Sequence, residues 1–202
     1  SDRTQKELED VLYSSLEEYN RMTKMVSDML FLAQADNNQL IPDRVMFDLS
    51  AEIIKVFDFF EAWAEERNIT LKFNGVHCLI EGDPQMFRRA INNLLSNALR
   101  YTPEDQAVTV SIKEQENYFE LMIENPGKPI PEEHLSRLFD RFYRVDPSRQ
   151  RKGEGSGIGL AIVKSIVEAH HGRVHVESDV RSTRFILSVP RLEKIINSTP
   201  QS

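Results

Sequence analysis

Glycine occupies every second position from Gly153 to Gly159, and Leu160 follows directly. A backbone without Cβ atoms can adopt positive φ angles and approach a bound group closely. Apolar residues then recur at helical spacing, which predicts a glycine-rich loop leading into the N-terminus of a helix. The unpaired N–H groups and the positive dipole end at such a terminus are suited to binding phosphate. The spacing matches neither a Walker A motif nor a Rossmann fingerprint, and glycine-rich loops are often only turns, so the phosphate hypothesis depends on other residues.

Two asparagines, Asn93 and Asn97, lie one helical repeat apart on a predicted helix and therefore share a face. Asparagine is unfavourable in a helix interior unless its amide has a role. Paired amide oxygens could bind a hard cation that also keeps phosphate oxygens and water. Arg100 and Tyr101, one turn further on, could add a phosphate contact and the edge of an aromatic ring. The alternative is that one asparagine only caps the helix or bonds locally.

A basic segment precedes the glycine loop in a chain whose net charge is −7. A run of charge is often no more than a solvated helix face. Because this run adjoins the glycine loop, we interpret it as part of an anion site. Its cations, set against Asp140 and Asp146, are Arg137, Arg141, Arg144, Arg149, Arg151 and Lys152.

The segment from Leu8 to Ala35 contains no glycine or proline and predicts one long helix. Its main apolar positions recur in steps of four and three, which is a heptad pattern. Further apolar residues widen the stripe, so a bundle of several helices is favoured over a two-stranded coiled coil. The alternative is a helix that lies on the following domain. The heptad positions are Leu8, Leu12, Ser15, Tyr19, Met22, Val26, Met29 and Ala33.

The remaining elements predict an α+β fold, a two-layer sandwich of helices on a mixed sheet. Strands are expected at 44–49, 69–73, 76–80, 107–114, 118–124, 173–177 and 184–189, with a hairpin turn at Asn74-Gly75. Helices are expected from an N-cap at Ser50 to about 67, from an N-cap at Asp83 to 101, from 132 to about 142, and over 158–171.

Composition narrows the classes of partner. A net charge of −7 argues against nucleic acid or an anionic membrane as the main ligand. The single cysteine, Cys78, excludes an internal disulfide, and its apolar neighbours predict a buried side chain. No long apolar run or signal-peptide pattern is present, so the sequence as given is expected to be soluble.

Taken together and in order, these motifs resemble the boxes of sensor histidine kinases. The segment 93–103 resembles the N box, 125–127 the G1 box, 139–144 the F box, 153–159 the G2 box and, more weakly, 183–185 the G3 box. The helix at 8–36 is similar to the second helix of the dimerisation and histidine-phosphotransfer domain. The resemblance covers nearly the whole chain, and within the family it is greatest to the heavy-metal, copper/silver, sensor kinases.

The resemblance implies a Bergerat fold, an ATP-binding sandwich of the kind found in gyrase and heat-shock chaperones, with ATP and Mg²⁺ as ligands. It assigns Mg²⁺ to Asn97 and a supporting, catalytic role to Asn93. Arg100 and Tyr101 would line the phosphate side. Arg144 would be catalytic and would reach the γ-phosphate.

The same resemblance places the adenine at Asn125, whose side chain would face the amino group, and at Gly127, which would let the ring approach. Glycines of the loop would form the hinge of an ATP lid, which is expected to be mobile. The remaining residues that the resemblance assigns to nucleotide binding are Ile130, Gly153, Gly155, Gly157, Gly159, Leu160 and Thr183.

For the whole protein, the resemblance implies a homodimer whose catalytic part lies on the cytoplasmic side of a bacterial inner membrane. ATP would phosphorylate a histidine on the first helix of the bundle, for relay to an aspartate of a response regulator. The chain would comprise the second bundle helix at 1–36, a linker at 37–43, the catalytic domain at 44–190 and a tail at 191–202.

The sequence departs from the family pattern at three points. The G1 position is Asn125 where Asp is usual, so the side-chain oxygen can accept from adenine without charge assistance. Ser182 replaces the usual glycine of the G3 box. None of the five histidines has the sequence context of the phospho-acceptor, so we expect this chain to bind ATP without phosphorylating itself. These histidines are His77, His134, His170, His171 and His175.

Two other functional classes stay open at this point. A nucleotide-gated clamp or ATPase of the gyrase kind would hydrolyse ATP, but its general base would fall at Asn93, which cannot accept a proton. A non-catalytic dimerising scaffold would use the long helix and leave the pocket empty.

Overall fold

The structure is a computed structural model that describes residues 2–145 and 156–191 of the 202-residue chain. The predicted lid positions Gly153 and Gly155, the cations Arg149, Arg151 and Lys152, and the tail from 192 onward lie outside these residues.

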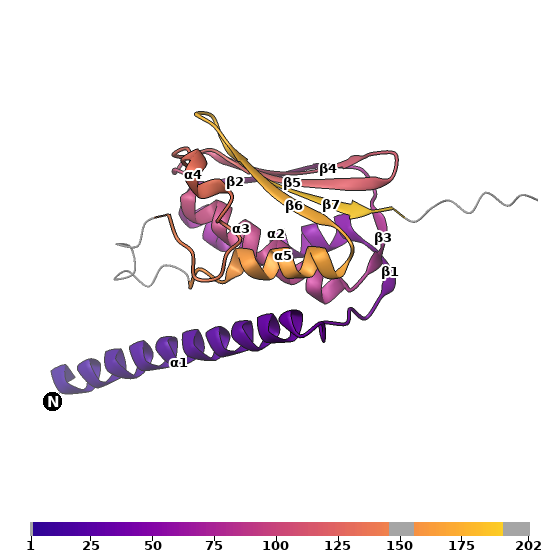
Figure 1. Ribbon diagram of the computed structural model, residues 1–202. Helices are drawn as coiled ribbons and strands as arrows, with labels where there is room; N and C mark the ends of the chain where they lie inside the picture. Colours follow the sequence, from indigo (N-terminus) through magenta and orange to yellow (C-terminus); the bar gives the residue numbers. More distant parts are fainter. Residues whose placement is uncertain (1, 146–155, 192–202) are drawn as a thin grey trace, which may run out of the picture.

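One mixed sheet of five strands, in the order β2-β4-β5-β7-β6, forms the first layer of the molecule (Figure 1). Strands β2 and β4 pair in parallel, and the other neighbours are antiparallel. The strands are β2 (Thr70–Gly75), β4 (Ala107–Glu114), β5 (Tyr118–Asn125), β6 (Arg173–Ser178) and β7 (Thr183–Pro190). A separate two-stranded ribbon joins β1 (Val45–Asp48) to β3 (Leu79–Gly82).

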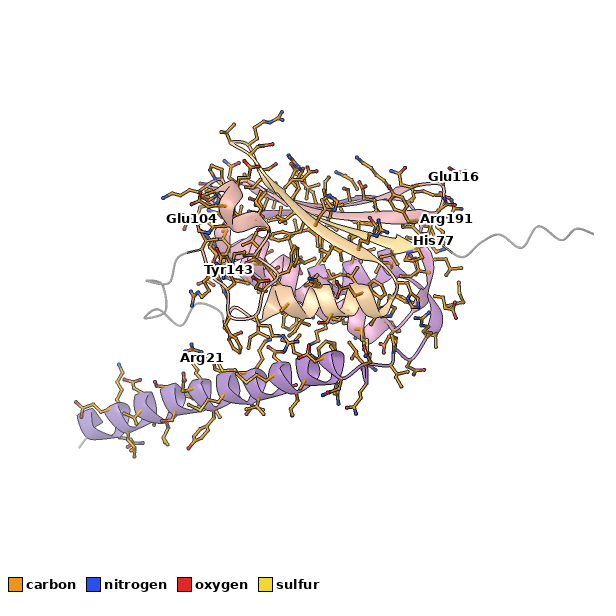
Figure 2. All side chains as sticks on the ribbon, viewed as in Figure 1. Arg21, His77, Glu104, Glu116, Tyr143 and Arg191 are labelled. Atoms are coloured by element: carbon orange, nitrogen blue, oxygen red, sulfur yellow. The ribbon has the colours of Figure 1, made fainter. Side chains whose placement is uncertain are left out.

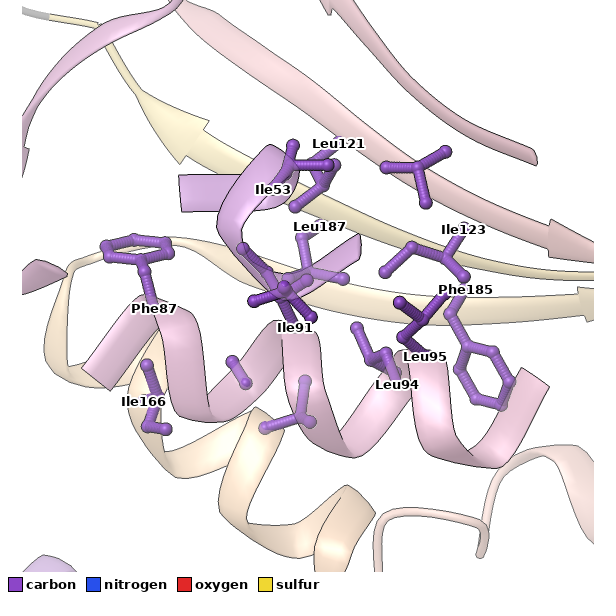
Figure 3. Close-up of a cluster of buried hydrophobic side chains, with 14 of the residues drawn as sticks. Ile53, Phe87, Ile91, Leu94, Leu95, Leu121, Ile123, Ile166, Phe185 and Leu187 are labelled. Atoms are coloured by element: carbon purple, nitrogen blue, oxygen red, sulfur yellow. The ribbon is translucent and has the colours of Figure 1, made fainter. Parts of the chain in front are cut away.

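Three helices cover one face of the sheet and form the second layer: α2 (Leu49–Glu66), α3 (Pro84–Tyr101) and α5 (Gly159–Ala169). The core lies between the layers, as Figure 3 shows for Leu94 and Leu95 of α3 with Ile123 of β5 and Phe185 of β7. On β5, buried residues alternate with half-exposed ones, which is the pattern of a strand with one face on the core. The predicted two-layer α+β class is therefore confirmed.

Helix α3 begins and ends where the sequence predicts. The Asp83 carboxylate accepts hydrogen bonds from the backbone N–H groups of Gln85 and Met86, and Pro84 occupies the first turn. At the other end, the Thr102 hydroxyl donates to the Ala98 carbonyl at 2.7 Å. These caps determine where α3 begins and ends, and its buried leucines determine the face on which its polar residues lie.

The prediction of a hairpin at Asn74-Gly75 is wrong. Both residues belong to β2 and pair with Ser111 and Ile112 of β4. The chain then leaves the sheet, and the next strand, β3, pairs with β1 instead. The turn motif at Asn74-Gly75 therefore does not join two paired strands, because the strands on either side of it pair with strands that are distant in sequence.

Two helix boundaries also differ from prediction. The N-cap of α2 is Asp48, whose carboxylate accepts from the Ser50 N–H at 2.9 Å, while the Ser50 hydroxyl donates to the Val76 carbonyl. The short helix α4 ends early, covering Glu132–Leu135, and turns continue to Phe142.

Helix α1 (Asp2–Asp36) extends beyond the sandwich and lies on the outer side of the helix layer (Figure 1). Its predicted apolar stripe is exposed along the N-terminal part, for example at Leu12 and Tyr19. Phe31 and Leu32, near its C-terminal end, are buried in the common core. Both interpretations of this helix thus have a structural counterpart: the exposed stripe offers a face to other helices, and the C-terminal end lies on the domain.

Candidate functional site

The polar residues of α3 lie on the side of the helix away from its core face. Leu94 and Leu95 are fully buried, whereas Asn93 and Asn97 are half-buried and border a cavity of about 1300 Å³. The predicted pairing of the two amides on one face is therefore present. Arg100 and Tyr101 border the same cavity one turn further along.

The C-terminal end of β5 supplies the opposite end of the cavity. Asn125 is buried, and its side-chain N–H donates to the Pro126 carbonyl at 3.0 Å. In the reverse orientation of the amide, the Asn125 side-chain oxygen would meet the Pro126 carbonyl oxygen, and both are acceptors. The orientation with the N–H toward Pro126 therefore leaves the Asn125 oxygen to face a ligand. At Gly127, a Cβ atom would come within 2.9 Å of the Tyr101 carbonyl oxygen. The absence of that atom lets the loop after β5 approach the end of α3.

A backbone hydrogen bond closes the base of the loop that contains the predicted lid. The Phe142 N–H donates to the Gly157 carbonyl at 2.9 Å, and both residues have positive φ. Tyr143, which is labelled in Figure 2, lies beside this base. It is held there by His134, whose Nδ1 lies 2.5 Å from the phenol oxygen, and by Arg137, which stacks over the ring. Arg144 follows directly and borders the cavity.

The β6–β7 hairpin forms the remaining wall through a set of hydroxyl contacts. The Ser178 hydroxyl accepts from the Ile130 N–H at 2.9 Å and lies 2.8 Å from the Thr183 hydroxyl. Thr183 pairs with Asn125 in the sheet register. Ser182, which replaces the usual glycine, donates to Glu124 at 2.6 Å.

Residues that are distant in sequence thus meet at one cavity. The predicted site residues that border it are Asn93, Asn97, Arg100, Tyr101, Asn125, Gly127, Ile130, Arg144, Gly157, Gly159, Leu160 and Thr183. Sequence reasoning missed Arg67, Tyr143 and the residues of α1 that also border it. The α1 residues lie at the spacing of one helix face, a signal that is present in the sequence, but the interpretation of this helix considered its apolar stripe and not its charged positions.

The cavity is strongly cationic. Among the described residues, its charged lining comprises one carboxylate, Asp28, and seven cations: Arg21, Lys24, Arg67, Arg100, Lys128, Arg144 and Arg181. In a chain of net charge −7, this local excess favours an anionic ligand. Arg67 has a structural role, because its guanidinium donates to the Leu99 and Thr102 carbonyls at the end of α3.

The amides fit a magnesium–phosphate group. The Asn93 Nδ2 atom is buried and has no hydrogen-bond partner among the described residues. A buried donor without a partner is unfavourable unless a ligand satisfies it, and a phosphate oxygen would do so. Gly159 lies against the oxygen side of the same amide, where a Cβ atom would come within 3.4 Å of Oδ1. Asn97 offers a further neutral oxygen of the kind that Mg²⁺ accepts.

The histidines and the cysteine do not form a second site among the described residues. His170 is buried at the end of α5, and desolvation lowers the pKa of its imidazole. Its ring accepts from the Asp83 N–H, a contact that suits the neutral form. Cys78 is buried as predicted, and burial raises the pKa of its thiol to about 12.

Comparison with known proteins gives consistent results. The family model described as histidine kinase-, DNA gyrase B- and HSP90-like ATPase matches residues 82–193. The chain is 83% identical to the probable sensor kinase SilS of Salmonella typhimurium over 98% of its length, and 66% identical to the sensor histidine kinase CusS of Escherichia coli K12 over 93%. It spans 41% and 39% of the lengths of these two relatives.

Solved structures share the fold. The histidine kinase AdeS of Acinetobacter baumannii superposes with a TM-score of 0.76 at 23% identity, covering 89% of this chain and 84% of that one. Among the described residues, no helix is both long and apolar enough to cross a membrane. The family model covers more than half of the chain, including α3, the loop after β5 and the glycine-rich segment, so the chain belongs to the histidine kinase-, DNA gyrase B- and HSP90-like ATPases and carries the ATPase domain of a sensor histidine kinase.

Proposed function

We propose that this domain binds Mg·ATP and transfers its γ-phosphoryl group to a histidine of the full-length kinase that is not among the five in this sequence. The observation that carries the proposal is the convergence of two amides, Arg144 and the end of β5 around one cationic cavity. Phosphoryl transfer depends mainly on positioning and on neutralising charge, and side chains of these types suffice for both.

Each part of the cavity has a separate task in this proposal. The Asn125 oxygen accepts from the adenine amino group, while Gly127 leaves room for the ring. Asn97 ligates Mg²⁺, and the Asn93 N–H, which has no partner among the described residues, donates to a phosphate oxygen. Mg²⁺, when bound, neutralises charge on the phosphate oxygens. Arg144 contributes positive charge at the transferred group.

The binding step is tested by calorimetric titration of Mg·ATP into wild type and Asn97→Ala. Loss of a metal ligand is expected to weaken binding at least about tenfold. Asn92→Ala is the matched control, because Asn92 lies on the same helix outside the cavity lining and should bind as wild type does. Equal affinities of the two variants would contradict the assignment of Asn97. If wild type itself did not bind millimolar Mg·ATP, a scaffold without nucleotide would be favoured.

The transfer step is tested by mixing this chain and radiolabelled ATP with a second chain that contains the acceptor helix. Label is expected on the second chain only, and Arg144→Ala should remove most of it. Label on this chain when it is incubated alone would contradict the proposal. A clamp or ATPase would instead release inorganic phosphate, and we expect almost none because Asn93 cannot serve as a base.

The biological setting that we propose follows the relatives and the sequence motifs. The full-length protein would be a homodimer of the inner membrane, with this domain on the cytoplasmic side. It would pass the phosphoryl group to an aspartate of a response regulator in copper/silver signalling. Phosphate transfer from the labelled acceptor chain to candidate regulators, compared in rate, tests the partner.

A further inference from the structure

Helix α1 contributes one wall of the cavity, although neither its motifs nor the family model assign it to nucleotide binding. Arg21, Lys24, Met25 and Asp28 all border the cavity together with Asn93 and Asn97. Their spacing places them on one face of α1. Arg21 lies on the side of α1 that faces the sandwich (Figure 2). Two cations of this wall therefore face the same space as the paired amides.

A buried carboxylate fixes this wall in place. Asp28 is 4% exposed, and it accepts from Arg89 of α3 at 2.6 Å and from Lys24 at 3.0 Å. The Arg89 guanidinium also lies 4.3 Å from the centre of the Phe31 ring. Arg89 and Asn93 are one helical repeat apart on α3, so α1 is attached directly beside the first amide.

The charges in this contact do not cancel. Asp28 is shared between Lys24 and Arg89. Among the described residues, the ion pair of Arg21 is a 3.5 Å contact with the exposed carboxylate of Glu18. An exposed pair of this kind contributes little. Within residues 2–145 and 156–191, the α1 wall therefore carries more positive than negative charge. It borders the same cavity as Asn93, whose buried amide N–H has no hydrogen-bond partner within those residues. A polyphosphate satisfies both features.

We propose that Arg21 and Lys24 of α1 bind the phosphate groups of the nucleotide, so that the nucleotide site includes both α1 and the sandwich. This inference rests on the proposed function and adds two binding residues to it. If the nucleotide contacts α1, nucleotide binding and the docking of α1 on the sandwich are coupled. Docking of α1 then raises the nucleotide affinity, and nucleotide binding stabilises the docked position of α1 by the same free energy.

The test is titration of Mg·ATP, Mg·ADP and adenosine into wild type and the double variant R21A/K24A. The double variant should lose about tenfold in affinity for Mg·ATP, less for Mg·ADP, and nothing for adenosine. K6A is the matched control, because Lys6 is an exposed lysine of α1 outside the cavity lining, and it should bind as wild type does. Unchanged Mg·ATP affinity in R21A/K24A, or an equal loss for adenosine, would overturn the inference.

Hydrogen exchange gives a readout that does not depend on affinity. Saturating Mg·ATP should slow amide exchange across residues 21–32 of wild-type α1, and this protection should be absent in R21A/K24A at equal saturation. Protection that is identical in the two proteins would overturn the inference even if affinity falls. Failure of the proposed function is distinguishable, because wild type would then bind no Mg·ATP at all.

Discussion

Gly157 and Phe142 form a close backbone contact at the base of the loop that borders the site. Gly157 has φ +72°, and a Cβ atom there would lie 3.0 Å from the Phe142 backbone. Gly159, two positions on, has an ordinary helical conformation and only a 3.4 Å contact with the Asn93 side chain. The two glycines therefore have different roles, although the sequence presents them as equivalent members of one motif.

This difference predicts that Gly157→Ala destabilises the domain and Gly159→Ala does not. Adding a Cβ at a positive φ and against fixed backbone should cost about 1–2 kcal/mol of unfolding free energy. At Gly159 the added methyl favours the helix and should leave that free energy within about 0.5 kcal/mol of wild type. Urea unfolding of both variants checks the prediction, and equal destabilisation would show that the base of the loop is not strained in this way.

Most residues of the site could be identified from the sequence because each belongs to a motif with its own chemistry. Asn93 and Asn97 are unusual in a helix, and Gly127 lies in the turn that follows a predicted strand. Tyr143 and Lys24 could not be identified in the same way. A tyrosine beside a phenylalanine and a lysine on a charged helix are common, and only the fold shows that both border the cavity.

Helix caps determine where the elements of this domain begin, and they couple elements to one another. His170, after the end of α5, accepts from the N–H of Asp83, which caps α3, at 3.0 Å. Its other ring nitrogen lies 2.7 Å from the Ile166 carbonyl. The ring must therefore carry its proton on Nδ1 and accept through Nε2. A second proton would place two donors face to face at the start of α3.

This geometry predicts that the domain loses stability as the pH falls below neutral. Desolvation lowers the pKa of folded His170 below its ordinary value of 6.5, so the unfolded chain binds more protons in the window just below pH 6.5. The free energy of unfolding should therefore decrease as the pH falls through 6.5 toward the lowered pKa. The carboxyl groups, with ordinary values of 3.8 and 4.5, contribute below this window.

Urea unfolding of wild type and His170→Gln from pH 7.5 to pH 5.5 measures the effect. His170→Gln should have a smaller slope of unfolding free energy against pH. Parallel curves for wild type and His170→Gln would show that another group governs this window.

Helices and strands could be predicted where a local sequence pattern determines them, but the pairing of strands that are distant in sequence could not. The alternation in β4 and β5 predicts their hairpin, and the Asp83-Pro84 cap predicts the start of α3. The parallel pairing of β2 with β4 joins segments separated by the whole of α3, and the ribbon of β1 and β3 is similarly non-local. Such pairings depend on core packing across the fold, which a local pattern does not contain.

At the scale of the whole molecule, the two ends of α1 differ in their exposure to solvent. Its N-terminal stripe, including Leu12 and Leu16, is exposed and suits the helical bundle that the resemblance implies. Its C-terminal end shares the core of the sandwich through Phe31 and Leu32. The predicted division of the chain at residue 36 stays a prediction, and the packing indicates that this end of α1 folds with the catalytic domain.

The attachment of α1 should depend on Asp28 much more than on Asp36, although both carboxylates pair with an arginine of the sandwich. Asp28 is buried between Lys24 and Arg89, whereas the Asp36 and Arg141 side chains are 54% and 39% exposed. Asp28→Asn leaves Arg89 partly buried without a countercharge, which should weaken the docking of α1 by about 2 kcal/mol of free energy. The loss is smaller than for a fully buried pair, because Arg89 regains some contact with solvent. Asp36→Asn exposes no buried charge, so water should replace most of the lost contact.

Native-state hydrogen exchange at the Phe31 and Leu32 amides measures this attachment without requiring the sandwich to unfold. In Asp28→Asn these amides should exchange roughly thirtyfold faster than in wild type, the rate equivalent of that free energy. Core amides of β5 exchange through larger openings that start from the same native state, so their rates should rise by no more than this factor. Exchange that rises equally in Asp28→Asn and Asp36→Asn would mean that the buried carboxylate is not what fixes α1 to the nucleotide cavity.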